Sequence, residues 1–176
     1  MDTRISLHPA TADDVDFIVD IDTNPALWLI EDEIEIDKNK VKNDIEERIG
    51  SDWYKYFIVR LNDTQQTPIG YVSIWHYIIR RKSWEIGYYI SREYRKQGYC
   101  YEAVSALLKY AFEDYGAHRV VAMCSSRNEA SWRIIEKAGM IREGVFREEL
   151  PCNDKWVDQL FYAILDNEYK LANTHK

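Results

Sequence analysis

Apolar residues recur at intervals of three and four in the first fifty residues, which predicts two amphipathic helices after a short strand. Thr11, with Asp14 three residues further on, caps the first helix, and Gly50 ends the second. The apolar positions that show this spacing are Val15, Ile18 and Val19, then Val41, Ile45 and Ile49. An acidic run at residues 31–37 separates the two helices and is expected to form a loop.

From residue 54 onward the apolar residues form short runs rich in Tyr, Val and Ile, separated by turn residues. Runs at 54–61, 69–80 and 84–91 predict an antiparallel meander. After a basic loop, the broad apolar face of residues 101–116 predicts a helix, and residues 118–124 predict a buried strand. This order of strand, loop, helix and strand is a βαβ unit.

The last third of the chain predicts one more helix and two strands. Residues 128–139 read as a helix with Asn128 as its N-cap and Gly139 just beyond its end. Strands at 140–150 and 155–165 then complete the chain around a turn. We therefore expect one mixed α+β domain covering residues 1–176, with a mostly antiparallel sheet and a βαβ unit in its second half.

Composition narrows the class of protein. The net charge of the 176 residues is −7, which argues against a nucleic-acid partner. Basic residues nonetheless cluster at 80–82 and 92–96, and such local clusters suit a small anionic ligand. The three cysteines, Cys100, Cys124 and Cys152, are too far apart for a CxxC metal or redox pair. No stretch is apolar enough for a membrane span or a secretory leader, so we expect a cytoplasmic protein without membrane contact or metal.

The segment "SREYRKQGYCYEA", residues 91–103, combines a basic loop, a glycine and the start of a helix. A loop that enters a helix at a glycine presents free backbone N–H groups at the positive end of the helix dipole, which suits a phosphate or pyrophosphate. Gly98 lets the backbone approach closely, and Arg95 and Lys96 add positive charge. Neither the Walker loop nor the GxGxxG dinucleotide motif is present.

The motif R-x-x-G-x-C, Arg95 to Cys100, resembles the R/Q-x-x-G-x-G/A acetyl-CoA motif of the GNAT superfamily of N-acetyltransferases. Downstream, "NEASWRIIEKAGMIREGVFREE" and "NDKWVDQLFYAIL" are similar to blocks of its Rim-type branch, which acetylates ribosomal-protein N-termini. The three blocks occur in the family's order between Trp84 and Leu165. The resemblance implies the GNAT fold, with the βαβ unit binding acetyl-CoA.

The resemblance also implies which residues hold acetyl-CoA, with no metal involved. The backbone of β-strand residues Tyr88, Tyr89 and Ile90 would hold the pantetheine arm, and one of these amides would polarise the thioester carbonyl. Asn128 matches a family asparagine near the pantetheine. The residues that would surround the pyrophosphate are Arg95, Lys96, Gln97, Gly98, Tyr99, Cys100 and Tyr101. Cys100 departs from the family's Gly or Ala and is not expected to act as a nucleophile.

Two catalytic roles follow from the same resemblance. Ser131 matches the hydroxyl that protonates the departing thiolate in Rim-type enzymes. The general base is either Glu149 or Glu85. An ungapped alignment from Asn153 places Leu150 at the family's glutamate position, so Glu149 replaces it only if a bulge shifts the strand register.

The expected activity is acetyl-CoA-dependent acetylation of a primary amine, with a protein N-terminal α-amine as the leading acceptor. Polyamine acetylation is an alternative suggested by the acidic run, although the tyrosine typical of that branch is Ile135 here. Another small amine, including an antibiotic, and a non-catalytic acetyl-CoA sensor also remain open, as does a monomer or homodimer. Most tryptophans are expected in the core, and some of Trp28, Trp75 and Trp84 are expected to line the acceptor groove.

Overall fold

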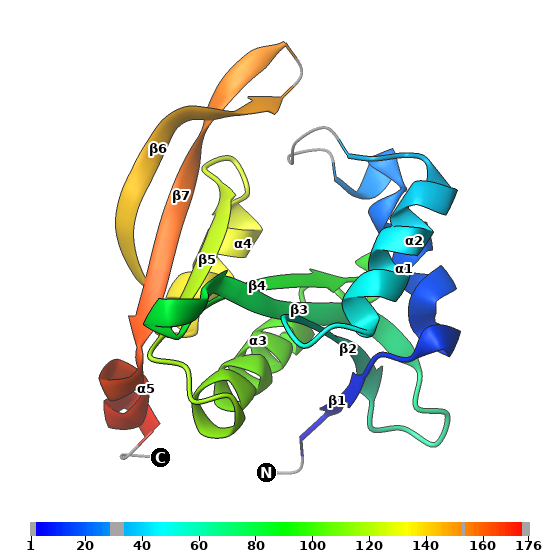
Figure 1. The fold of residues 1–176 in the computed structure, drawn as a ribbon, viewed down its shortest axis with the longest axis horizontal. Coiled ribbons are helices and arrows are strands. Elements are labelled where there is room, and N and C mark those ends of the chain that lie inside the picture. Colours follow the sequence, from blue (N-terminus) through cyan, green and yellow to red (C-terminus); the bar gives the residue numbers. More distant parts are fainter. Residues whose placement is uncertain (1–2, 29–33, 153, 174–176) are drawn as a thin grey trace.

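The computed structural model describes residues 3–28, 34–152 and 154–173 and centres on one seven-stranded mixed sheet (Figure 1). Its strands lie in the order β1-β2-β3-β4-β5-β7-β6, and every neighbouring pair is antiparallel except β4 and β5. The strands are β1 (Ile5–Pro9), β2 (Tyr54–Leu61), β3 (Pro68–Ile78), β4 (Ser83–Ile90), β5 (Arg119–Ser125), β6 (Ile141–Cys152) and β7 (Lys155–Leu165).

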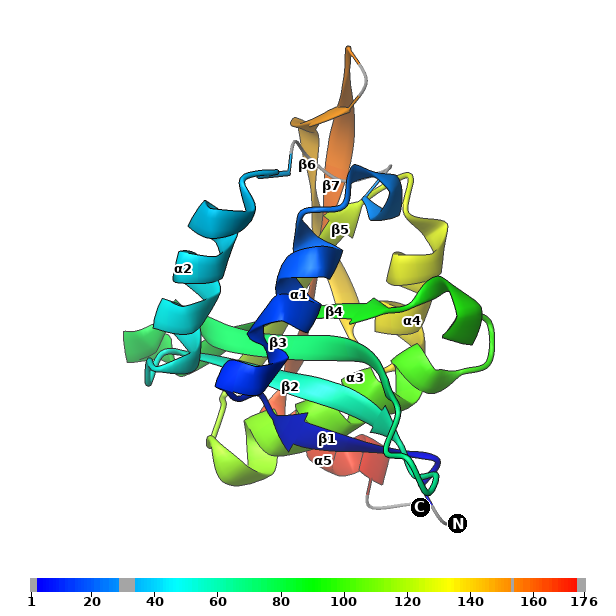
Figure 2. The same ribbon diagram turned by 90° about the vertical axis from the view of Figure 1, so that its right-hand side faces the viewer.

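Helices cover both faces of the sheet. Figures 1 and 2 show the first two helices on one face of β2, β3 and β4, with the third on the opposite face. The helices are α1 (Val15–Asp22), α2 (Lys38–Ile49), α3 (Tyr99–Lys109), α4 (Glu129–Lys137) and α5 (Asp166–Asn173), and a π-helical segment, Tyr110–Asp114, extends α3. Short 3₁₀ turns occur at Ala12–Asp14, Pro25–Leu27, Ile79–Arg81 and Arg92–Tyr94. No helix within the described ranges is long and apolar enough to cross a membrane.

Two apolar cores follow from this layering. The larger core lies beneath α3 and α4 and includes Val72, Leu107 and Ile135. The smaller core lies beneath α1 and α2 and is rich in tyrosine, including Tyr71 and Tyr89. Because side chains alternate along a strand, successive residues of β4 contribute to opposite cores. β4 therefore presents chemical groups to both faces of the sheet.

The parallel pair β4 and β5 is joined only at its beginning. The paired residues are Ser83 with Arg119, Trp84 with Val120, and Glu85 with Val121. Beyond Glu85 the two strands diverge, which Figure 1 shows as a widening gap, although β4 continues to Ile90 and β5 to Ser125. One edge of β4 is thus left without a strand partner among the described residues, at the centre of the βαβ unit.

The mixed α+β fold and its βαβ unit confirm the sequence prediction, with one element missed. We expected the chain to finish with a strand, but α5 follows β7 directly. Its start is stabilised by the Glu168 carboxylate, which accepts a hydrogen bond from the Leu165 amide at 2.9 Å. Its Tyr169 ring stacks on Phe112 of the π-helical segment, a nonlocal contact that the local pattern does not reveal.

The acidic run begins outside the described residues, at positions 31–33. Its described end is structural: Asp37 is the N-cap of α2 and accepts hydrogen bonds from the Asn39 and Lys40 amides. Glu35 pairs with Lys40 at 2.5 Å. The described part of this run therefore serves the start of a helix, as a capping residue typically does.

Candidate active site

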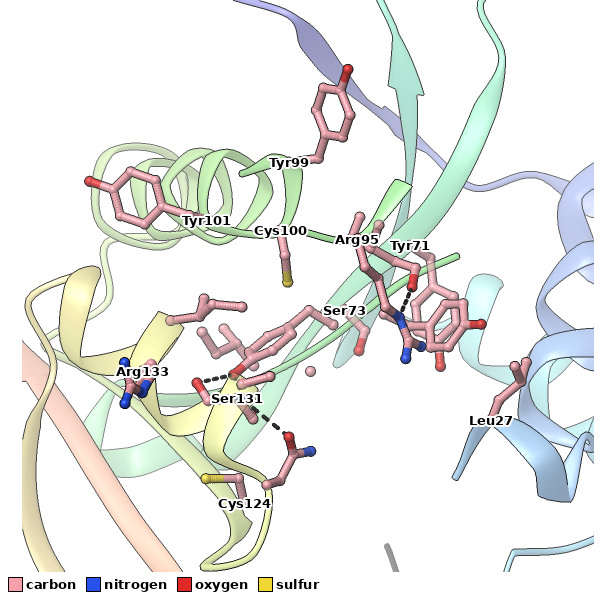
Figure 3. Close-up of a pocket in the computed structure, with 18 of the residues that line it drawn as sticks. Leu27, Tyr71, Ser73, Arg95, Tyr99, Cys100, Tyr101, Cys124, Ser131 and Arg133 are labelled. Carbon is pink, nitrogen blue, oxygen red and sulfur yellow. Dashed lines mark hydrogen bonds between the residues drawn. The ribbon is translucent and has the colours of Figure 1, made fainter. Parts of the chain in front are cut away.

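A cavity of about 840 Å³ occupies the gap between β4 and β5 and reaches both faces of the sheet (Figure 3). Its walls come from the second half of β4, from β5, and from the first turns of α3 and α4. On the other face, β3 and the segment around Trp28 close it. The strand divergence thus places most of the predicted site residues around one space.

The free edge of β4 forms the middle of this cavity. Tyr88, Tyr89 and Ile90 all line it, as the prediction for the pantetheine arm requires. Beyond Glu85 no described strand pairs with β4 on the β5 side, and the Ile90 carbonyl oxygen accepts a hydrogen bond from Arg95. An extended ligand with amide groups can pair with such an edge in the way that a peptide adds to a sheet. This strand edge fits the pantetheine arm.

The start of α3 provides a second, anion-binding feature. Gly98 is the N-cap, with a φ of 91°, and no side chain caps the helix among the described residues. The amides of its first turn therefore remain available at the positive end of the helix dipole. A Cβ at position 98 would lie 3.1 Å from the Arg4 side chain, so glycine relieves both crowding and backbone strain. The arrangement fits a pyrophosphate.

Four cationic side chains line the cavity, two from the loop before α3 and two from α4. They are Arg95, Lys96, Arg133 and Lys137, the last two of which the sequence analysis did not identify. The Arg95 Nε donates to the Ile90 carbonyl oxygen at 2.8 Å, so Arg95 folds back onto the end of β4. Gln97, also expected to contact the cofactor, does not line the cavity, and its side-chain amide donates to the Glu93 carbonyl oxygen.

The residues of the first α3 turn point in different directions. Cys100 points into the cavity, whereas the rings of Tyr99 and Tyr101 point in two other directions, away from the Cys100 side chain (Figure 3). Burial raises the pKa of the Cys100 thiol to about 12. A thiol that stays protonated is a poor nucleophile, which agrees with the expectation that Cys100 takes no covalent part.

Ser131 lies in the first turn of α4 and faces the same cavity. Its amide donates to Asn128 Oδ1 at 3.2 Å, so Asn128 is the N-cap that the sequence predicted. Its hydroxyl lies 2.8 Å from the Tyr88 hydroxyl, as the dashed line in Figure 3 marks. A hydroxyl held at this position can give a proton to a leaving group in the cavity, and the tyrosine orients it.

Glu85 sits where β4 and β5 separate, on the face that α1 and α2 cover. It lines the cavity opposite Trp75 of β3 and hydrogen-bonds the Trp75 side chain. Burial raises the pKa of Glu85 to about 7, and the hydrogen bond with Trp75 opposes that rise in part. A carboxyl group with a pKa near neutrality can accept a proton at physiological pH and release it again.

Glu149, the other base candidate, lies outside the cavity. The register between β6 and β7 does shift between Phe146 and Leu150, so the bulge that the alignment demanded is present. Glu148 within it has a φ of 52°. The bulge nevertheless leaves the Glu149 side chain exposed on the hairpin and away from the residues that line the cavity.

The cavity also contains an aromatic compartment that the sequence analysis identified only in part. Trp28 and Trp75 line it, whereas Trp84 is buried in the larger core and stacks on Tyr115. Tyr54, Tyr71 and Ser73 line it as well, although no sequence motif marked them. Tyr71 donates a hydrogen bond of 2.5 Å to Asp22 of α1, which brings residues 49 positions apart together.

The described side chains offer no group of ligands for a metal ion. Among the described residues no three His, Cys, Asp or Glu side chains are close enough together to hold a metal ion. The cavity instead combines an open strand edge, an uncapped helix start and cationic side chains. These features fit an elongated anionic thioester such as acetyl-CoA.

Comparison with known proteins also indicates an acetyltransferase. Residues 4–141 match the model of the family described as "Acetyltransferase (GNAT) domain". The chain is 36% identical over 113 residues to the uncharacterized N-acetyltransferase YnaD of Bacillus subtilis, covering 64% of this chain and 65% of that protein. It is 34% identical over 92 residues to the putative ribosomal N-acetyltransferase YdaF of the same organism, covering 52% and 50%. These matches thus span less than two thirds of the curated relatives' lengths.

The fold has a close counterpart among solved structures. The spermidine N-acetyltransferase from Vibrio cholerae, in complex with CoA and spermine, superposes with a TM-score of 0.87. The alignment covers 96% of this chain and 99% of that one at 20% sequence identity. At this identity the likeness establishes the shared fold.

Proposed function

Since the chain belongs to the GNAT acetyltransferase family, we propose that it transfers the acetyl group of acetyl-CoA to a primary amine, with the free α-amine of a protein or peptide N-terminus as the leading acceptor. The observation that carries this proposal is the position of Glu85, a half-buried carboxyl group with a pKa of about 7 at the point where β4 and β5 separate. It lies where an amine from one face can meet a thioester on the other.

The proposed reaction is direct transfer. Glu85 accepts a proton from the bound ammonium group, and the neutral amine nitrogen attacks the thioester carbonyl carbon. A β4 amide donates to the oxygen that becomes negative, a contribution worth about 3 to 4 kcal/mol for one donor in other enzymes. The carbon–sulfur bond then breaks, and Ser131 gives its proton to the departing thiolate while Tyr88 supports the serine hydroxyl. The attached nitrogen releases its extra proton to water to become an amide, and Ser131 takes a proton back from water.

The pKa of Glu85 is closer to that of an α-amine than to that of a lysine side chain, which favours an α-amine as the acceptor. An α-amino group has a pKa of about 7.7 to 8, whereas a lysine side chain has one of about 10.4. A carboxylate whose own pKa is about 7 removes the proton from the first group at a much smaller free-energy cost than from the second. The 34% identity with a putative ribosomal N-acetyltransferase supports the same acceptor class.

Polyamine acetylation is the second candidate, because a spermidine N-acetyltransferase shares the fold. A polyamine carries further ammonium groups that need carboxylate partners. Among the described residues that line the cavity, Glu85 is the sole carboxylate, beside four cationic side chains. Charge therefore favours an acceptor with one amine.

The experiment is thiol release from acetyl-CoA by the purified protein with peptides that have free N-termini, with spermidine and with small amine drugs. Peptides of identical sequence with a blocked N-terminus are the matched control. Release that requires the free N-terminus supports the proposal. Preference for spermidine would favour the polyamine reading, and acetyl-CoA binding without turnover on any amine would favour a sensor.

A further inference from the structure

The part of the cavity on the α1 and α2 face is walled almost entirely by aromatic rings. We define this acceptor compartment by five rings and one carboxylate: Trp28, Tyr54, Tyr71, Trp75, Tyr89 and Glu85. Glu85 is the only charged group among these six, and the cations of the cavity belong to the loop before α3 or to α4. An acceptor that fills this space meets one carboxylate, ring surface and the Ser73 hydroxyl, which already hydrogen-bonds the Tyr54 side chain.

The polar ends of the five rings are all bonded within the protein. Trp75 bonds Glu85 and Tyr89 bonds Arg95, and both of these partners line the cavity. Trp28 Nε1 donates to the Ile21 carbonyl oxygen at 2.9 Å. The Tyr71 hydroxyl donates to Asp22 at 2.5 Å, and the Tyr54 side chain hydrogen-bonds Ser73 and Tyr56. Because these N–H and O–H groups are satisfied within the protein, ring carbon is what remains to contact a ligand.

Ring packing holds the compartment in shape before any ligand binds. Tyr54 stacks on Trp75 with centroids 5.2 Å apart and an interplanar angle of 2°. Tyr89 packs against both Tyr71, at 6.2 Å, and Trp28, at 5.6 Å. A preformed apolar wall binds a complementary group without the entropic cost of ordering its own side chains.

The charges narrow the choice of acceptor further. Asp22 lies behind Tyr71, is bonded to it and does not line the cavity, so it offers no second anionic contact. A second ammonium group on the acceptor would find no second carboxylate in the compartment. A carboxylate on the acceptor would find no cationic side chain there. A small first residue such as alanine would leave the aromatic wall unfilled.

We propose that the acceptor compartment selects peptide N-termini whose first residue has a large apolar or aromatic side chain, with Glu85 binding the α-amine and Trp28 with Tyr89 contacting that side chain. This selectivity rests on the proposed function, because it concerns the acceptor of the same acetyl transfer. Ring-on-ring and ring-on-alkyl contacts carry the recognition, and the single carboxylate fixes the amine.

The test uses the whole chain, acetyl-CoA and peptides that differ only in their first residue: Phe, Leu, Ala, Ser or Asp. We expect kcat/KM for the Phe and Leu peptides to exceed that for the Ala and Ser peptides by about tenfold or more. Equal or better turnover of the Ala, Ser or Asp peptide would overturn the inference while leaving the acetyl transfer to α-amines intact.

A measurement of peptide binding tests the inference even if no peptide is acetylated. The same peptides are titrated into the protein saturated with CoA, and tighter binding of the Phe peptide than of the Ala peptide is expected. Equal affinities would overturn the inference. Absence of turnover combined with selective binding would overturn the proposed function alone.

Two tryptophan variants test whether the preference for a large first residue arises in the acceptor compartment. Trp28→Ala should lower the ratio of kcat/KM for the Phe peptide to that for the Ala peptide, mainly by raising KM for the Phe peptide. Trp156 is 64% exposed on β7 and does not line the cavity. Trp156→Ala should therefore keep the wild-type ratio, and a fall in both variants would contradict a role specific to the compartment.

Discussion

The Tyr88 hydroxyl lies 2.8 Å from the Ser131 hydroxyl, and this contact joins β4 to α4 across the gap where β4 leaves β5. Asn128 holds the same serine from its other side by accepting a hydrogen bond from the Ser131 amide. The serine hydroxyl is therefore fixed at the end of the cavity where the thiolate of the proposed reaction departs.

Ser131→Ala is predicted to lower kcat by about tenfold to a hundredfold with little change in KM, because proton donation acts in the transition state. Tyr88→Phe should lower it less, since the serine hydroxyl remains. Steady-state kinetics with a peptide acceptor measures both. Ser105→Ala, on α3 and outside the cavity, is the control. Unchanged kcat in Ser131→Ala would remove the serine from the mechanism.

The rate should depend on the protonation of Glu85. Because burial raises its pKa to about 7, kcat/KM should fall as pH decreases through 7, when the carboxylate gains a proton and can no longer act as base. The peptide amine adds its own ionisation near pH 8. Glu85→Gln should lower kcat/KM by about a hundredfold or more and remove the ionisation near 7.

Glu149→Gln distinguishes the two base candidates. Glu149 is exposed and outside the cavity, so its neutral variant should retain the wild-type pH profile. Loss of the ionisation near pH 7 in this variant, with Glu85→Gln still active, would assign the base to Glu149.

Gly98→Glu is predicted to weaken acetyl-CoA binding by about a hundredfold or more, because it places a carboxylate beside the proposed phosphate site. The change also strains the backbone, since φ at this position is 91°. Gly116, with a φ of 60° and open space around its α-carbon, is the matched control. Gly116→Glu should be strained in the same way and yet bind acetyl-CoA normally in a calorimetric titration. Retained affinity in Gly98→Glu would exclude the proposed cradle.

The Cys100 thiol should be unreactive and dispensable. With a pKa of about 12, the thiolate fraction at pH 8 is about one in ten thousand. Alkylation by iodoacetamide at this position, followed by mass spectrometry of the intact protein and its peptides, should be slow. Cys100→Ala should retain turnover, and a variant without activity would point to a covalent role.

Asp22 should make stability depend on pH. Burial raises its pKa from 3.8 to about 6, and the Tyr71 hydrogen bond opposes this in part. The folded chain therefore keeps a proton that the unfolded chain releases between about pH 4 and 6, and stability is lost as pH rises through that window. Above pH 6, the free energy of unfolding of Asp22→Asn should exceed that of the wild type by about 2 to 3 kcal/mol, and at pH 4 the two should be equal.

Urea titrations at pH 4 and pH 8 measure this difference. Asp20→Asn is the control, because the Asp20 side chain is 69% exposed on the same helix. Equal stabilisation of Asp22→Asn at both pH values would show that the buried charge is not its cause.

The features that sequence predicts best here are local. Gly98 before a helix and Asn128 at an N-cap depend on neighbouring residues alone, and both are found where expected. The compartment walls depend on strand register instead: Tyr71 meets Asp22 of α1, and Trp75 lies opposite Glu85, only after the sheet has formed. No local motif contains that information.

The same reasoning explains the two base candidates. Glu85 and Glu149 are both strand carboxylates next to an apolar residue, and the printed sequence does not show which of them faces the cavity. The early divergence of β4 from β5 leaves Glu85 half-buried at the cavity wall, whereas Glu149, next to the bulge in β6, is exposed on the outside. Burial, which sets the pKa, is a property of the assembled fold.

The most direct measurement locates the acetyl group after a single turnover. The protein with bound acetyl-CoA is mixed with a peptide that has both a free N-terminus and an internal lysine, and the product is sequenced by tandem mass spectrometry. The account predicts one acetyl group on the N-terminal nitrogen for each CoA released. Acetylation of the lysine, or CoA release without an acetylated peptide, would contradict it.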